Sequence, residues 1–193
     1  MNFKNTAFRI FFGAFMLFSV FSFGQNKKKS NAWDQREIGL QLVGLDNFDF
    51  DFLYKEKVDK NAYRRFSLGF ANLALQNIGD DGSGAFSAGI NIGREKRRPL
   101  SDKLNLAHGV TWVGNFSVNS LSSTTVSTVA TGVGFILGVH YQLSDEFYVG
   151  AEIFPRILMN FAITDDGIEN FGFNAGFNSR SVGISLVYKF VKK

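Results

Sequence analysis

The sequence of 193 residues contains no cysteine, so it can form no disulfide and cannot carry a lipid through a cysteine. Its only histidines are His108 and His140, which is a poor supply for metal sites and for nucleophile–base pairs. Only two prolines are present, against 20 glycines and 23 phenylalanines. That composition is typical of short strands joined by tight turns rather than of helices.

Charge is absent from one long stretch, which runs from Leu104 to Ser144 and covers 41 positions (144 − 104 + 1). A soluble surface usually contains about 25–35% charged residues, so this stretch does not resemble one. It also lacks any run of 18 apolar residues and is interrupted by glycine, serine and threonine, which argues against membrane-spanning helices.

The first 24 residues follow the order of a secretory signal peptide. Lys4 and Arg9 form a basic start, residues 10–23 are mainly apolar, and small residues precede a cut after Gly24. The apolar run is shorter than the roughly 20 residues that a spanning helix needs. We expect a signal peptide at 1–24, a short polar periplasmic segment at 25–35 and one domain at 36–193. Cleavage would lower the net charge from +4 to +2, which argues against a nucleic-acid binder.

Large apolar residues alternate with small or polar ones along the rest of the chain, as expected for strands with two different faces. At 45–47 we expect a three-residue turn, with one long bulged strand as the alternative. A further bulge is expected near Asn72, where the alternation changes phase. An even number of antiparallel strands can close on itself and so remove its edges. The pattern predicts an all-β fold, an eight-stranded antiparallel up-and-down barrel. Its expected strands are 36–44, 48–55, 63–78, 84–95, 104–118, 130–143, 147–163 and 171–190.

Alternation alone does not say which face is inside. A soluble lipid-binding barrel would turn its large residues inward, whereas a transmembrane barrel turns them outward to lipid. The uncharged stretch favours the transmembrane barrel, because its smaller face of Gly, Ser, Thr and Asn suits a tight polar lumen. In lipid only helices and closed barrels satisfy every backbone group.

The end of the chain carries a motif. Ser181-x-Gly183-x-x-Leu186-x-Tyr188 is followed by the aromatic Phe190 and a short tail, 191–193. With the segment pattern and the leader, it resembles the small eight-stranded outer-membrane β-barrel proteins of Gram-negative bacteria, a porin-like family. The resemblance implies a location in the cell outer membrane, contact with its lipids and recognition of the last strand by the barrel-assembly machinery. Many members stop at the aromatic itself, and this chain does not.

The resemblance also implies that both termini are periplasmic. Turns at 56–61, 96–103 and 144–146 would then be periplasmic, and those near Asp46 and at 79–84, 119–129 and 164–170 extracellular. The stretch 119–129 is rich in Ser and Thr, and we expect a solvated loop there rather than an adhesive surface.

Several charged residues share the phase of the small residues and should point into the lumen. They are Asp49, Asp51, Arg65, Glu152 and Arg156. Buried charges must be paired, so we expect a network in which the two arginines face carboxylates. Such a network could line a pore, but a barrel of eight strands is barely wide enough for its own side chains. We expect a plug.

We expect no enzyme, no cofactor and no metal. His108 falls in the outward phase and His140 in the lumen phase, where a hydrogen-bonded structural role is expected. The acidic sequences at 80–82 and 165–167 indicate turns, because they lack the spacing of a calcium loop. The sequence therefore predicts a structural or surface-interaction role, with a narrow porin or a soluble periplasmic lipid-binding barrel as alternatives. It names no ligand and no extracellular partner.

Overall fold

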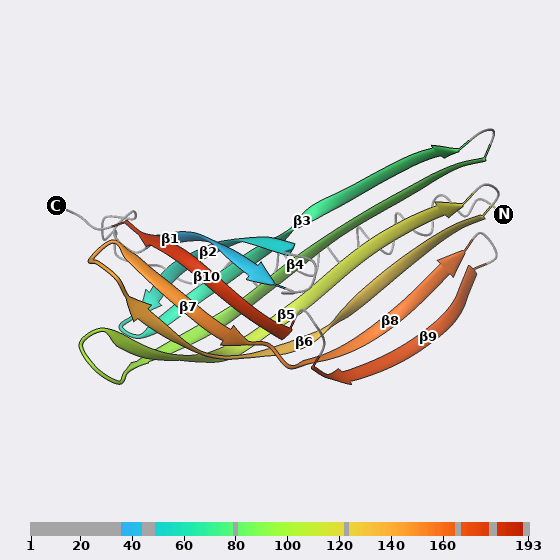
Figure 1. The fold of residues 1–193 in the computed structure, drawn as a ribbon. Coiled ribbons are helices and arrows are strands. Elements are labelled where there is room, and N and C mark those ends of the chain that lie inside the picture. Colours follow the sequence, from blue (N-terminus) through green and yellow to red (C-terminus); the bar gives the residue numbers. More distant parts are fainter. Residues whose placement is uncertain are drawn as a thin grey trace. The chain divides into compact units, whose positions relative to one another are not determined.

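The computed structural model describes residues 36–43, 49–78, 81–121, 124–164, 167–177 and 181–190, which form ten strands (Figure 1). The predicted leader, the segment 25–35 and the turn at 45–47 lie outside the described residues. Among those described, no helix could cross a membrane. The strands are β1 (Arg36–Val43), β2 (Asp49–Asp59), β3 (Ala62–Ile78), β4 (Asp81–Pro99), β5 (Leu104–Leu121), β6 (Thr124–Gln142), β7 (Phe147–Ile153), β8 (Arg156–Thr164), β9 (Gly167–Gly176) and β10 (Val182–Lys189).

Eight of these strands form a closed antiparallel barrel, which confirms the predicted fold class. From β1 to β7, each strand pairs with the strand that follows it in the chain. β10 pairs with both β7 and β1 and so closes the ring. The bulge predicted near Asn72 is confirmed by a register shift between Gly69 and Asn72 in the pairing of β3 with β4.

The prediction of the last two strands was wrong in one respect, because the structure divides each predicted segment into two strands. The segment 147–163 breaks between β7 and β8 at Phe154 and Pro155. Proline has no N–H to donate and a fixed φ, which interrupts a ladder. The segment 171–190 likewise breaks between β9 and β10. As a result β7 and β10 belong to the barrel, whereas β8 pairs with β6 and β9 with β8.

The tilt of the strands follows from their register. A path of directly paired residues leaves β6 at Tyr141, crosses every strand of the ring and returns to β6 at Thr131, ten residues away (141 − 131). A stagger of this size requires tilted strands, typically by about 35–45° in barrels. The intermediate steps are Val149, Leu186, Leu40, Phe52, Leu68, Ile90 and Gly114.

Four strands are much longer than the ring requires. β3 to β6 have 17–19 residues, whereas β1, β7 and β10 have seven or eight. Their extra length, 70–78, 81–88, 115–121 and 124–132, continues together with β8 and β9 as one sheet beyond the ring (Figure 1). We call it the projecting sheet.

The predicted loop at 119–129 was wrong, because β5 runs to Leu121 and β6 begins at Thr124. Valine and threonine favour strands. Here the valines and threonines of 124–129 pair with β5, and Val126, for example, lies opposite Asn119. The other turns predicted at this end are also shorter, since β4 begins at Asp81 and β9 at Gly167. At the opposite end β2 and β4 likewise extend into predicted turns, and the turn at 144–146 is confirmed.

The large apolar residues of the ring face outward, as predicted. On β6 the outward row runs from Val133 to Tyr141 in alternate positions, each 40–49% exposed. The positions between them include the buried Ile136 and His140. Other exposed residues of the same kind are Leu40, Phe50, Phe52, Leu68, Val110, Val182, Ile184 and Leu186.

Two inward glycines make room for polar side chains in the ring. A Cβ on Gly138 would lie 2.6 Å from Cγ of Glu152 and 2.5 Å from the carbonyl oxygen of Ala151. A Cβ on Gly150 would lie 2.5 Å from Oγ of Ser185 and 3.1 Å from the His140 ring. Both positions therefore require glycine for packing.

We expect Gly138→Ala to lower the free energy of unfolding by about 1–3 kcal/mol, because the methyl group overfills the interior. Gly172→Ala is the control, since a Cβ there meets nothing within 4 Å. Urea unfolding followed by tryptophan fluorescence measures both. Equal stability of the two variants would contradict the close packing at Gly138.

Candidate functional site

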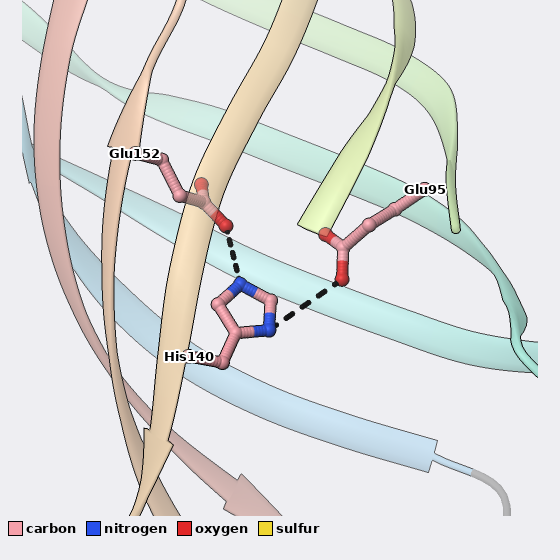
Figure 2. A group of neighbouring side chains, drawn as sticks. All are labelled: Glu95, His140 and Glu152. Carbon is pink, nitrogen blue, oxygen red and sulfur yellow. Dashed lines mark hydrogen bonds and ion pairs between the residues drawn. The ribbon is translucent and has the colours of Figure 1, made fainter. Parts of the chain in front are cut away.

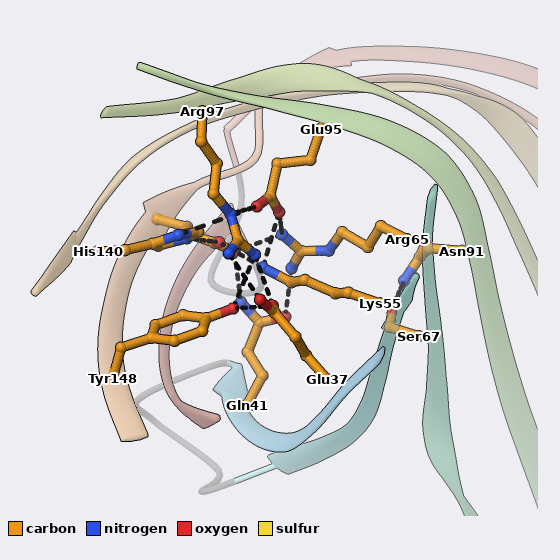
Figure 3. A network of polar contacts seen from close by, with 11 residues as sticks. Glu37, Gln41, Lys55, Arg65, Ser67, Asn91, Glu95, Arg97, His140 and Tyr148 are labelled. Atoms are coloured by element: carbon orange, nitrogen blue, oxygen red, sulfur yellow. Dashed lines mark hydrogen bonds and ion pairs between the residues drawn. The ribbon is translucent and has the colours of Figure 1, made fainter. Parts of the chain in front are cut away.

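Charged and polar side chains from six strands meet inside the closed ring (Figure 3). Each comes from a position in the inward phase of its strand, which is why residues so distant in sequence point to one centre. We call this group the interior network. It consists of Glu37 and Gln41 on β1, Lys55 on β2, Arg65 on β3, Glu95 and Arg97 on β4, His140 on β6, and Tyr148 and Glu152 on β7.

At its centre two cations share two carboxylates. The Lys55 ammonium lies 2.7 Å from Glu95 and 3.6 Å from Glu152. The Arg65 guanidinium lies 2.7 Å from Glu152 and 3.2 Å from Glu95. The Gln41 amide joins the group, because it donates to Glu152 at 3.0 Å and accepts from Arg65 at 2.9 Å.

A second cluster adjoins the first through Glu95. Arg97 donates two parallel hydrogen bonds to Glu37, at 2.8 and 2.7 Å, and a third from Nε to Glu95 at 2.7 Å. The Tyr148 hydroxyl donates to Glu37 at 2.8 Å and accepts from Arg97 at 2.9 Å. The Arg97 guanidinium also lies 3.8 Å from the centre of the Tyr63 ring. The two parallel hydrogen bonds between Arg97 and Glu37 make a strong and directional contact.

The charges of the interior network balance. Three cations, Lys55, Arg65 and Arg97, face the three carboxylates Glu37, Glu95 and Glu152. Lys55 and Glu95 are completely buried, so an unpaired charge in either place would be very costly. The group is thus neutral when His140 is neutral.

Glu95, His140 and Glu152 have the spacing of a metal site, since one ligand atom of each lies within 4.8 Å of the others (Figure 2). His140 Nε2 is 2.8 Å from Glu152, and Nδ1 is 3.9 Å from Glu95. Both carboxylates are already neutralised by Lys55 and Arg65. A divalent ion would add two positive charges to a buried and balanced group, so the arrangement favours an internal salt-bridge network over a metal centre.

The structure places the five predicted lumen residues differently from one another. Arg65 and Glu152 are both buried and form an ion pair at 2.7 Å. Asp51 is buried, whereas Asp49 and Arg156 are half-buried. Asp51 and Arg156 line a cavity of about 20 Å³ beside Arg65, space for about one water molecule.

Most of the interior network was not predicted from the sequence. The alternation along the predicted strands could have identified three further members, because they fall in the inward phase: Glu37, Lys55 and Glu95. Arg97 lies beyond the predicted end of its strand at residue 95, and the sequence alone could not place it. His140 was placed correctly in the lumen, where it is hydrogen-bonded to Glu152, and His108 is exposed on the other face.

The predicted assembly signal lies on and beside the last strand. Ser181 and Gly183 face inward and are buried, and Leu186 faces outward with half its surface exposed. Tyr188 packs against Phe147 at 5.1 Å and Phe190 at 5.2 Å between ring centres. The structure describes this strand as an ordinary member of the ring, and its recognition by assembly machinery stays a prediction.

Comparison with known proteins gave no match among protein-family models or curated sequences. Among solved structures, the chain is similar to Ail, the attachment invasion locus protein of Yersinia pestis. The identity is 11%, the TM-score is 0.42, and the match covers 81% of this chain and 94% of that one. With so distant a likeness, the fold assignment rests on the strand pairing described above.

We expect Glu152→Gln to lower the free energy of unfolding by about 3–5 kcal/mol, because Arg65 and Lys55 then lack a carboxylate in a buried site. Glu56→Gln is the matched control. Its carboxylate is 3.7 Å from Arg64 in an exposed pair, which should contribute no more than about 1 kcal/mol.

Urea unfolding measures both variants. If Glu152→Gln fails to fold, Tyr148→Phe tests the same network, because it removes only the hydroxyl that donates to Glu37. A loss of about 1–2 kcal/mol is expected there. Stability unchanged in Tyr148→Phe as well would show that the network does not support the barrel.

Proposed function

We propose that this protein is a transmembrane barrel of the bacterial outer membrane with a closed lumen and a structural or surface-interaction role. Three features support the proposal: the outward apolar belt, the balanced charges inside the ring, and the sheet that projects from one end of the barrel.

The apolar belt carries the membrane assignment. The outward row of β6 spans nine residues, from Val133 to Tyr141, and a tilted strand needs about 9–11 residues to cross a bilayer. Near the short turns the belt ends in aromatic rings, among them Tyr141, Phe147 and Tyr188. Aromatic side chains favour the membrane interface, and such rings flank the apolar band of outer-membrane barrels.

The interior supports a membrane barrel over a soluble carrier. A soluble barrel that binds lipid would need apolar side chains around its lumen. Here the inward positions hold buried groups such as Lys55, Glu95 and Glu152, while apolar side chains occupy the outside. In water such an arrangement would expose the belt and bury the charges, the reverse of what favours folding.

The interior network favours a plugged lumen over a narrow porin. Its cations and carboxylates are bonded to each other across the ring and not arranged along a path (Figure 3). Each charge of the interior network already has a partner, as with Arg65 and Glu152. The same closure favours no catalysis there, because a substrate could not reach His140, which is only 2% exposed.

The projecting sheet is the part best suited to contact other molecules. Along β9, Ile168, Phe171 and Phe173 are 64–67% exposed, far more than the belt residues of β6. Among the described strands β9 pairs with β8 alone. An edge strand offers unpaired backbone groups to a further strand, which supports a role in surface interactions.

Leu137→Arg and Phe173→Arg together test the membrane span. Leu137 lies mid-belt, where arginine should cost about 2–4 kcal/mol, whereas Phe173 lies in the projecting sheet and should cost roughly 0–1 kcal/mol. Both side chains are exposed, so neither substitution overfills a core. Urea unfolding in lipid vesicles measures the difference. A protein that stays soluble without lipid and tolerates both changes would be a soluble barrel.

The closed lumen predicts stable insertion into planar bilayers without conductance steps. The mature chain, residues 25–193, should be refolded and its insertion checked by the heat-dependent gel mobility of membrane barrels. Reproducible single-channel steps that change with Arg65→Ala would instead indicate a narrow porin, and the plug would be wrong.

A further inference from the structure

A basic patch lies on the outer surface of the barrel near its short turns. Its four members are exposed and occupy the outward phase of β3 and β4. Next to them on β5 is the exposed His108, which pairs directly with Lys96 in the register. The members are Arg64, Arg94, Lys96 and Arg98.

The register places like charges side by side in this patch. Arg64 and Arg94 are direct partners across β3 and β4, and like charges in such a pair repel. Among the described residues, the ion pair of this patch joins Arg64 to Glu56, 3.7 Å apart. One exposed carboxylate cannot balance four cations, so the patch carries a clear excess of positive charge.

The patch begins where the apolar belt ends. On the same outward faces, Phe66 of β3 and Ile92 of β4 lie two positions farther from the short turns, and they pair with each other. Arg64 and Arg94 therefore follow the last apolar row directly. Long basic side chains at such a boundary can rest their carbon chains on apolar surface and extend their charge into the headgroup layer.

We propose that this patch binds the phosphate groups of anionic phospholipids in the leaflet beside the short turns. The proposal rests on the membrane span proposed above and adds the lipid class that the barrel prefers. Planar guanidinium groups suit phosphate oxygens, which can accept two hydrogen bonds from one arginine. A phosphate near Arg64 and Arg94 would also relieve their mutual repulsion.

The test compares spin-labelled phosphatidylglycerol with spin-labelled phosphatidylcholine around the protein in phosphatidylcholine vesicles. Electron paramagnetic resonance gives the fraction of each lipid immobilised by the barrel. At low salt we expect phosphatidylglycerol to associate with the barrel about threefold more strongly than phosphatidylcholine. The preference should fall in roughly 0.5 M salt, because salt screens the surface charge.

The double variant Arg94→Glu and Lys96→Glu should abolish the preference. Glutamate at position 94 would face Arg64 across the ladder, so folding should not suffer. The control is Lys60→Glu with Lys103→Glu, which changes net charge equally at exposed turn positions. It should keep the preference.

Three outcomes would overturn the proposal. Equal association of the two lipids with the native protein excludes selective binding. A preference lost equally in both double variants would indicate net charge and not the patch. Immobilisation of neither lipid would refute the membrane span as well, whereas the first two outcomes would refute the patch alone.

Discussion

The mutual neutralisation of six charged side chains inside a ring of eight strands is the constraint on which the structure depends. Lys55, Arg65 and Arg97 cannot lie inside the ring without Glu37, Glu95 and Glu152, and these partners come from strands far apart in sequence. The network can form only when the ring has closed in its ten-residue stagger. Ring closure thus brings the opposite charges together, and glycines such as Gly138 give their side chains room.

With charge inside, the apolar residues are left outside. The alternation of a strand separates its two faces completely, so a lumen filled by polar groups implies a belt such as Val133–Tyr141 on β6. The belt ends near the short turns in aromatic rings on one part of the circumference and in the basic patch on another. Both kinds of side chain suit a boundary between hydrocarbon and headgroups.

The barrel and the projecting sheet use the same strands for different purposes. β1, β7 and β10 are only long enough for the ring, whereas β3 to β6 continue beyond it. Pro155 ends β7 and redirects the chain into β8, which pairs with the extended part of β6. Exposed aromatic residues of β9 are thereby held apart from the belt.

Much of the fold could be predicted from sequence because side-chain alternation is a local property. Strand identity, outward orientation and the bulge near Asn72 follow from neighbouring residues. Loops follow less well from sequence. The polar tract 124–129 suggests a loop, although its valines and threonines favour strands and pair with β5. Arg65 and Glu152 could be predicted as interior residues, because each alternates in phase with the small residues of its strand.

By itself the sequence determined the eight alternating segments and which of their faces is apolar, since both depend on residues one or two positions apart. Only the tertiary structure decided which charges meet, because the pairing of Arg65 with Glu152, or Arg97 with Glu37, depends on stagger and ring closure. It also decided that the last two segments divide between ring and projecting sheet. That division depends on which strands are near enough to share hydrogen bonds.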